Sequence, residues 1–162
     1  MTIVSSTQDL EALTFTIVAE LAAPPSRVWQ VWSDPRQLER WWGPPTWPAT
    51  FEEHDVVAGG GSRYYMTGPE GEKSRGWWRF LALDEPRSLE FEDGFADESG
   101  LPNTQMPTTR ARVDLEETAA GTRMTVTSRF ASVEQMEQLV QMGMVEGMTQ
   151  AMDQIDEILA AA

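Results

Sequence analysis

The chain of 162 residues contains no cysteine and only one histidine, His54. The lack of cysteine excludes disulfide bonds, thiolate catalysis and zinc sites with cysteine ligands. A single histidine excludes a metal site with two histidine ligands, and we expect neither a metal nor another cofactor. His54 stands among acidic residues at positions 52–55, a pattern typical of a solvated strand edge, so we assign it no catalytic role.

Basic residues are also scarce, with 12 lysines and arginines against 26 acidic residues and a net charge of -14. This balance disfavours binding to nucleic acid or to an anionic membrane surface. The N-terminus lacks the basic and apolar regions of a signal peptide, and no apolar run is long enough to span a bilayer. We therefore expect a cytoplasmic protein with no nucleic-acid or membrane partner. The sequence gives no indication of its oligomeric state.

The dominant pattern is an apolar stripe over residues 132–161, which predicts one long amphipathic helix. Ser132 and Gln135 have the spacing of a capping box at its start. Apolar residues then recur at steps of three or four, from Met136 to Ile158. Such a helix would be about 40 Å long. It must cover another apolar surface to be stable in water.

The same segment is rich in methionine and contains Gly143 and Gly147 in its middle. One interpretation is an ordinary core, in which methionines fill space and the glycines allow close packing on a sheet. The other is that this face roofs an adaptable cavity, because methionine side chains repack around different shapes.

The preceding residues alternate between apolar and polar in several short runs. Residues 13–21 predict a first strand, and two short helices follow around Val28 and Leu38, the second capped by Asp34. Six further strands are expected at 50–58, 62–67, 74–83, 88–92, 109–116 and 122–130, with a long acidic loop at 93–107. Residues 1–10 read as a loose tail of a single domain spanning 1–162. The result is an α+β helix-grip fold, in which a curved antiparallel sheet of about seven strands surrounds the C-terminal helix.

Several short motifs occur in an order that resembles a known family. They are Ala23-Pro24, Val28-Trp29, Asp34-Pro35, Trp41-Trp42-Gly43, Gly76-Trp77-Trp78, Gly121-Thr122-Arg123 and Met142-Gly143-Met144. Together they resemble the START-like (SRPBCC) helix-grip superfamily. Within it, the chain is most similar to the family of the C-terminal domain of the activator of the ninety-kilodalton heat-shock protein ATPase. The resemblance implies a cavity for apolar or amphipathic small molecules, but no single activity.

Bulky apolar and aromatic residues of the sheet and helix are the candidates for contact with such a ligand. Alternation separates Tyr64 and Met66 from Arg63 and Tyr65, and leaves open which pair faces inward. Arg110 and Arg112 are expected to face water. The predicted ligand-binding residues are Trp41, Trp42, Tyr64, Met66, Trp78, Phe80, Phe91, Met124, Met144, Met148 and Met152.

These patterns favour a non-enzymatic protein that binds an apolar or aromatic small molecule between the sheet and the C-terminal helix. No nucleophile paired with a base is recognisable, so no catalytic residue is predicted. Two alternatives remain open. One is a polyketide cyclase or aromatase, which would place His54 or Tyr64 with an arginine in the cavity. The other is a chaperone-interaction module, which would use an exposed face.

Overall fold

The computed structural model describes residues 3–160 and contains one large antiparallel sheet with helices on its inner face. The strands follow one another along the sheet in the order β1-β2-β8-β7-β6-β5-β4-β3. Their bounds are β1 Ile3–Asp9, β2 Thr14–Leu21, β3 Ala49–His54, β4 Gly61–Thr67, β5 Lys73–Asp84, β6 Ser88–Phe95, β7 Thr108–Thr118 and β8 Gly121–Arg129. The helices are α1 Pro25–Ser33, α2 Pro35–Leu38, α3 Val133–Gln141, α4 Met144–Met152 and α5 Ile155–Ala160.

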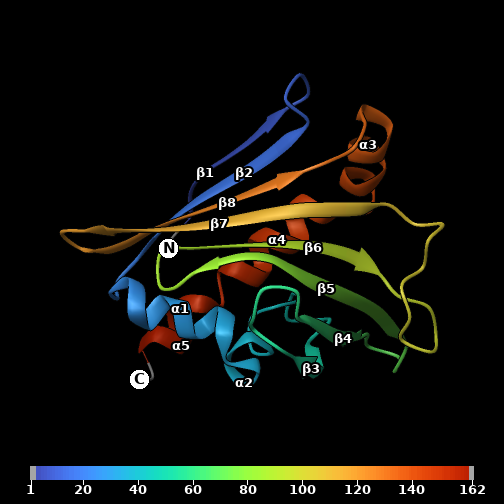
Figure 1. The fold of residues 1–162 in the computed structure, drawn as a ribbon, viewed down its shortest axis with the longest axis horizontal. Coiled ribbons are helices and arrows are strands. Elements are labelled where there is room, and N and C mark those ends of the chain that lie inside the picture. The colour runs from blue at the N-terminus through green and yellow to red at the C-terminus, as the bar shows by residue number, and fades with distance from the viewer. Residues whose placement is uncertain (1–2, 161–162) are drawn as a thin grey trace.

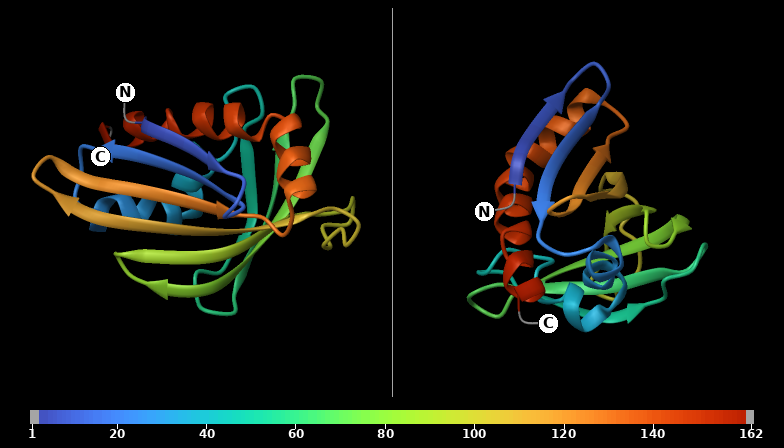
Figure 2. Two further views of the ribbon diagram at one scale, coloured as in Figure 1. Left: turned by 90° about the horizontal axis from the view of Figure 1, so that it is seen from above. Right: turned by 90° about the vertical axis from the view of Figure 1, so that its left-hand side faces the viewer.

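The sheet curls around the C-terminal helices, so the predicted α+β helix-grip architecture is confirmed (Figure 2). The helices α1 and α2 carry the chain from β2, near one edge, to β3 at the other edge (Figure 1). They close one end of the space enclosed by the sheet. Both short helices were predicted, and the Asp34 side chain caps α2 by accepting from the Arg36 backbone N–H at 3.0 Å.

The number of strands and the start of the chain differ from the sequence prediction. Residues 3–9, expected to be part of a loose tail, form β1 and pair antiparallel with β2. The sheet therefore has eight strands rather than seven, and the two helices follow its second strand. Except for the half-buried Ile3, β1 is exposed. Because β1 lacks an apolar face, its sequence does not alternate between apolar and polar residues and does not indicate a strand. Residues 1–2 of the predicted tail lie outside the described residues.

The register of β7 and β8 pairs apolar residues across the two strands. Val113 lies opposite Val126 and Leu115 opposite Met124, and all four are buried. Because side chains alternate along a strand, Arg110 and Arg112 point to the opposite face and are exposed, as expected.

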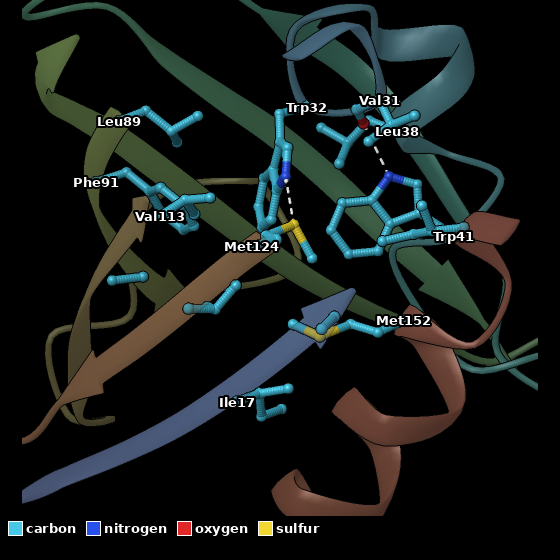
Figure 3. Close-up of a cluster of buried hydrophobic side chains, with 14 of the residues drawn as sticks. Ile17, Val31, Trp32, Leu38, Trp41, Leu89, Phe91, Val113, Met124 and Met152 are labelled. Atoms are coloured by element: carbon cyan, nitrogen blue, oxygen red, sulfur yellow. Dashed lines mark hydrogen bonds between the residues drawn. The ribbon is translucent and has the colours of Figure 1, made fainter. Parts of the chain in front are cut away.

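Buried aromatic and sulfur-containing side chains form the core beneath α1 and α2 (Figure 3). The Trp32 indole N–H donates to the Met124 sulfur at 3.4 Å, and the Trp41 indole N–H donates to the Val31 carbonyl at 2.8 Å. Met152 points from α4 towards the sheet between Trp41 and Ile17 (Figure 3). Fully burying a large apolar side chain contributes roughly 1.5–3 kcal/mol, so this cluster ties α1, α4 and the sheet together.

The predicted single C-terminal helix is instead divided into three segments. The first break lies at Met142 and Gly143, where Gly143 has φ 89° and is the N-cap of α4. A second, milder break at Asp153 and Gln154 separates α4 from α5. Figure 2 shows α5 continuing the line of α4, whereas α3 turns away from it. Ala161, the expected last residue of the helix, lies outside the described residues.

The predicted cap at Ser132 is present with one difference in detail. The Ser132 hydroxyl accepts from the Gln135 backbone N–H at 3.1 Å, whereas the Gln135 side chain accepts from the Ala131 backbone N–H, one residue earlier than in a capping box.

Two loop boundaries also differ from the sequence prediction. The strand predicted at 50–58 ends at His54, and β6 continues through Asp93 to Phe95, into the segment expected to be a loop.

His54 is not part of a solvated edge, although β3 is an edge strand. A bulge between Phe51 and Glu53 exposes both Glu52 and Glu53 and returns His54 to the inner side. Its Nε2–H donates to the Trp32 carbonyl at 2.9 Å, and its Nδ1 accepts from the Ser62 hydroxyl at 2.6 Å. Burial lowers the pKa of His54, which favours this neutral form. The residue joins the sheet edge to α1.

The break at Gly143 predicts opposite effects of one substitution at two glycines. Gly143→Ala should lower the free energy of unfolding by about 1 kcal/mol, because a side chain disfavours the left-handed conformation. Gly147→Ala, inside α4, should raise it by roughly 0.5–1 kcal/mol through helix propensity. An added Cβ meets no atom within 4 Å at either position, so steric clashes should not contribute to the difference in stability between the two variants. Urea unfolding of both variants measures the difference, and effects of equal sign would contradict a break at Gly143.

The cap of α3 predicts a second stability effect. Ser132→Ala removes the acceptor for the Gln135 N–H and should lower the free energy of unfolding by about 1 kcal/mol. Gln138→Ala, on the exposed face of the same helix, serves as the control and should change it by less than about 0.5 kcal/mol. Urea titration followed by tryptophan fluorescence measures both variants, and equal stabilities would show that the cap does not stabilise α3.

Candidate ligand-binding site

A cavity of about 410 Å³ lies between the inner face of the sheet and the C-terminal helices. Small-molecule sites typically have volumes of roughly 300–1,000 Å³. One side of the cavity is formed by residues of β4, β5, β6 and β7 together with the segment after α2, whose Trp42 packs against the sheet. The opposite wall comes from α3 and α4. The lining residues are Trp41, Trp42, Gly43, Pro44, Trp47, Tyr64, Met66, Ser74, Asp93, Gly94, Phe95, Pro107, Thr109, Leu139, Met142, Gly143, Met144, Gly147, Met148, Ala151 and Met152.

Seven of the eleven sequence-predicted residues line this cavity: Trp41, Trp42, Tyr64, Met66, Met144, Met148 and Met152. The other four, Trp78, Phe80, Phe91 and Met124, are buried in the core and do not line it. For Trp78, Phe91 and Met124 the reason is the side chain of Trp32. Its ring lies 6.3 Å from Trp78 and 6.2 Å from Phe91, between centroids, and its indole N–H contacts Met124. Trp32 thus fills the space that these strand positions would otherwise open.

Aromatic contacts hold the sheet side of the cavity in a fixed shape. Trp42 packs edge-on against Trp78, with ring centroids 4.8 Å apart and an interplanar angle of 86°. Tyr64 stacks on Phe51 at 4.9 Å and 22°. Such paired rings contribute stability beyond their buried area. Trp42 and Tyr64 therefore present preformed surfaces to the cavity.

Methionines form most of the opposite wall. Met144 and Met148 of α4 are half-buried, and Met142, at the end of α3, is 54% exposed. Gly143 and Gly147 lie among them and leave open space where side chains would stand. This wall combines flexible side chains with unfilled volume, so it can adapt its shape to a bound molecule.

A polar pair, Tyr64 and Asp93, lies within the apolar lining. The Tyr64 hydroxyl donates to Asp93 Oδ1 at 3.3 Å. Its phenol occupies the place where a side chain at Gly76 would stand, so the glycine lets the two groups meet. Burial raises the pKa of Asp93 to about 7, while the hydrogen bond from Tyr64 acts in the opposite direction. Burial, and next the nearby Asp93 charge, raise the pKa of Tyr64 well above its usual value.

Asp93 is a polar lining residue that the sequence does not predict, because it falls within the loop expected at 93–107. The signal was present in the alternation of β6. Leu89 and Phe91 face inward and are buried, and two residues further the same face carries Asp93. In the register of the sheet, Asp93 lies opposite Trp78 on β5.

The ionisable groups of the cavity wall can carry only negative charge. Among its lining residues, all within the described part of the chain, only Asp93 and Tyr64 can ionise, and none is Lys, Arg or His. Ser74 and Thr109 add hydroxyl groups. The indole Nε1 of Trp42 is buried and makes no hydrogen bond, so one donor in the wall is unsatisfied.

Over residues 3–160, no cluster of three or more His, Asp or Glu side chains is arranged to hold a metal ion. In the same range, no helix has the length and apolarity needed to cross a membrane.

Comparison with known proteins agrees with this architecture. The model of the family described as "Activator of Hsp90 ATPase homolog 1-like protein" matches residues 22–160. Among the curated proteins, none matches the chain. A solution structure from Arthrobacter aurescens is 56% identical, with a TM-score of 0.95, covering 99% of this chain and 94% of that one. A crystal structure from Mycobacterium smegmatis is 48% identical, with a TM-score of 0.90, covering 99% and 98%.

A third structure, described as an AHSA1 protein from Silicibacter pomeroyi, shares the fold at 20% identity. Its TM-score is 0.72, and the match covers 91% of this chain and 98% of that one. The family match spans most of the sequence, from the end of β2 to the end of α5, and includes every segment that lines the cavity. The chain therefore belongs to the family of Activator of Hsp90 ATPase homolog 1-like proteins.

Proposed function

We propose that this protein binds an apolar or aromatic small molecule in the cavity between the sheet and the C-terminal helices. The observation that carries the proposal is a cavity of about 410 Å³ that is lined mainly by apolar and aromatic residues, among them three tryptophans and five methionines. Family membership is compatible with this role but names no ligand.

Apolar burial would supply most of the affinity. Each Å² of apolar surface removed from water contributes about 25 cal/mol, although association entropy offsets part of this. The rings of Trp42 and Tyr64 are held by their neighbours, so they lose little freedom when a ligand binds. Met144 and Met148 would then close over molecules of different outline.

A second candidate function is acid–base catalysis on a bound carbonyl compound. The pair of Asp93 and Tyr64 favours it, since a carboxyl group with a pKa of about 7 in an apolar cavity suits a general base near neutral pH. His54 and arginine, which the sequence offers as candidates for such a role, do not line the cavity. The Asp93 carboxylate would take a proton from the carbon next to the carbonyl and return it.

Blocking the cavity tests the binding proposal. Gly147→Phe should place a ring in the open space beside Gly147 and weaken binding of the neutral dye N-phenylnaphthylamine by roughly tenfold or more. Replacing glycine in a helix also favours folding, so loss of binding would not reflect unfolding. Fluorescence titration of the dye measures the effect.

The matched control is Gln150→Phe, which adds the same ring to the exposed side of α4 and should leave the dye affinity unchanged. Equal affinity of Gly147→Phe and the unmodified protein, or no saturable binding of the dye by either, would contradict the proposal.

Exchange of carbon-bound hydrogen tests the catalytic candidate. In deuterium oxide, the protein should accelerate loss of the α-proton signal of β-tetralone, and Asp93→Asn should abolish the acceleration because it removes the base. Proton NMR follows the exchange. Glu92→Gln, which alters the neighbouring acid on the outer face of β6, should retain it. A rate equal to that of buffer would leave binding as the only function proposed for this site.

A further inference from the structure

We propose that the cavity selects a molecule with an aromatic or apolar body and a positively charged amine, which pairs with Asp93. The inference rests on the proposed binding function and narrows the class of ligand. It depends on three observations: the sign of charge in the wall, the partners of Asp93 and the aromatic surfaces around it.

The wall offers negative charge and no positive charge. Asp93 is its only carboxyl group, and no Lys, Arg or His is among the lining residues. The chain as a whole carries a net charge of -14. A carboxylate ligand such as a fatty acid would enter without a partner for its charge, beside an acidic group. The electrostatics therefore disfavour anionic ligands.

Asp93 lacks a counter-charge in the described structure. Its hydrogen-bond partner is the Tyr64 hydroxyl, which engages Oδ1. Its neighbours in the sheet register are Trp78 on β5 and Thr109 on β7, neither of which is charged. Of the groups facing it from β4, β5, β7 and the helices, only Tyr64 titrates. Asp93 is half-buried, and a carboxylate drawn partly out of water without a cation is costly. An ammonium group on the ligand would supply the missing partner.

The surrounding rings suit the same ligand. Trp41, Trp42, Trp47, Tyr64 and Phe95 all line the cavity, and aromatic faces attract ammonium groups, most strongly after desolvation. The ring of Trp42 is held against Trp78, and that of Tyr64 against Phe51. These preformed surfaces could contact the aromatic body and the charged group together.

The pKa of Asp93 predicts how binding depends on pH. Since burial raises it to about 7, Asp93 is mostly protonated at about pH 6 and mostly ionised at about pH 8 in the free protein. An amine that requires the carboxylate should bind about tenfold more weakly at about pH 6 than at about pH 8. A neutral ligand should show little change.

A matched series of ligands tests the inference. Isothermal titration calorimetry at constant ionic strength compares naphthylmethylamine, naphthylmethanol and naphthoate, which share one aromatic body. At about pH 8 we expect naphthylmethylamine to bind roughly tenfold or more tightly than naphthylmethanol. Naphthoate should bind roughly tenfold or more weakly than naphthylmethanol. Lowering the pH to about 6 should weaken the amine and strengthen naphthoate.

Two variants, each of which removes one negative charge, distinguish the local effect of Asp93 from the effect of the protein's overall negative charge. Asp93→Asn should remove the preference for the amine and its pH dependence while still binding naphthylmethanol. Glu92→Gln, one residue away on the opposite face of β6, should retain both. Asp93→Asn is also expected to fold, with a higher melting temperature than the unmodified protein at about pH 8. The raised pKa means that stability is lost as pH rises through about 7, and asparagine removes that loss.

The outcomes distinguish this inference from the function on which it rests. If all three compounds bind with equal affinity, the selection of a cation is wrong. If the amine preference survives in Asp93→Asn, the pairing of the amine with Asp93 is wrong. In both cases the binding function stands. If none of the three binds, the binding function is wrong and the inference falls with it.

Discussion

The break at Gly143 is the constraint on which the rest of the site depends. A continuous helix from Ser132 would keep one direction over the sheet, and its apolar stripe would pack along it. Because Gly143 adopts a left-handed conformation, α3 turns away and α4 starts in a new direction. The side chains of Met142, Met144 and Met148 surround this change of direction. The covering layer is therefore incomplete here, which leaves a cavity where a regular helix would leave core.

Two kinds of wall enclose that cavity, and they serve different purposes. On the sheet side, Trp42 and Tyr64 are fixed by rings behind them, and Tyr64 in turn directs its hydroxyl at Asp93. On the helix side, methionines and glycines leave volume and freedom of movement. If the cavity binds a molecule as proposed, a site built in this way would fix the polar end of that molecule and tolerate variation in its body.

The sequence predicted elements whose residues alternate or recur with a clear period. The inward face of β2 follows directly from alternation. β1 was missed because its polar residues are exposed and lack an apolar face. The helix break was hidden because the apolar recurrence continues through Gly143, whereas its φ angle is a property of the folded chain. Which aromatic residues line the cavity depends on Trp32, whose position is set by α1 rather than by any strand.

The position of Asp93 joins the stability of the fold to the chemistry of the site. The desolvation that raises its pKa to about 7 also destabilises the folded protein when the carboxyl group ionises. In the same environment, however, an opposite charge interacts more strongly than it would in water. Tyr64 satisfies one carboxylate oxygen but contributes no charge. The free energy that ionised Asp93 costs the empty protein would therefore favour a cation that enters the cavity.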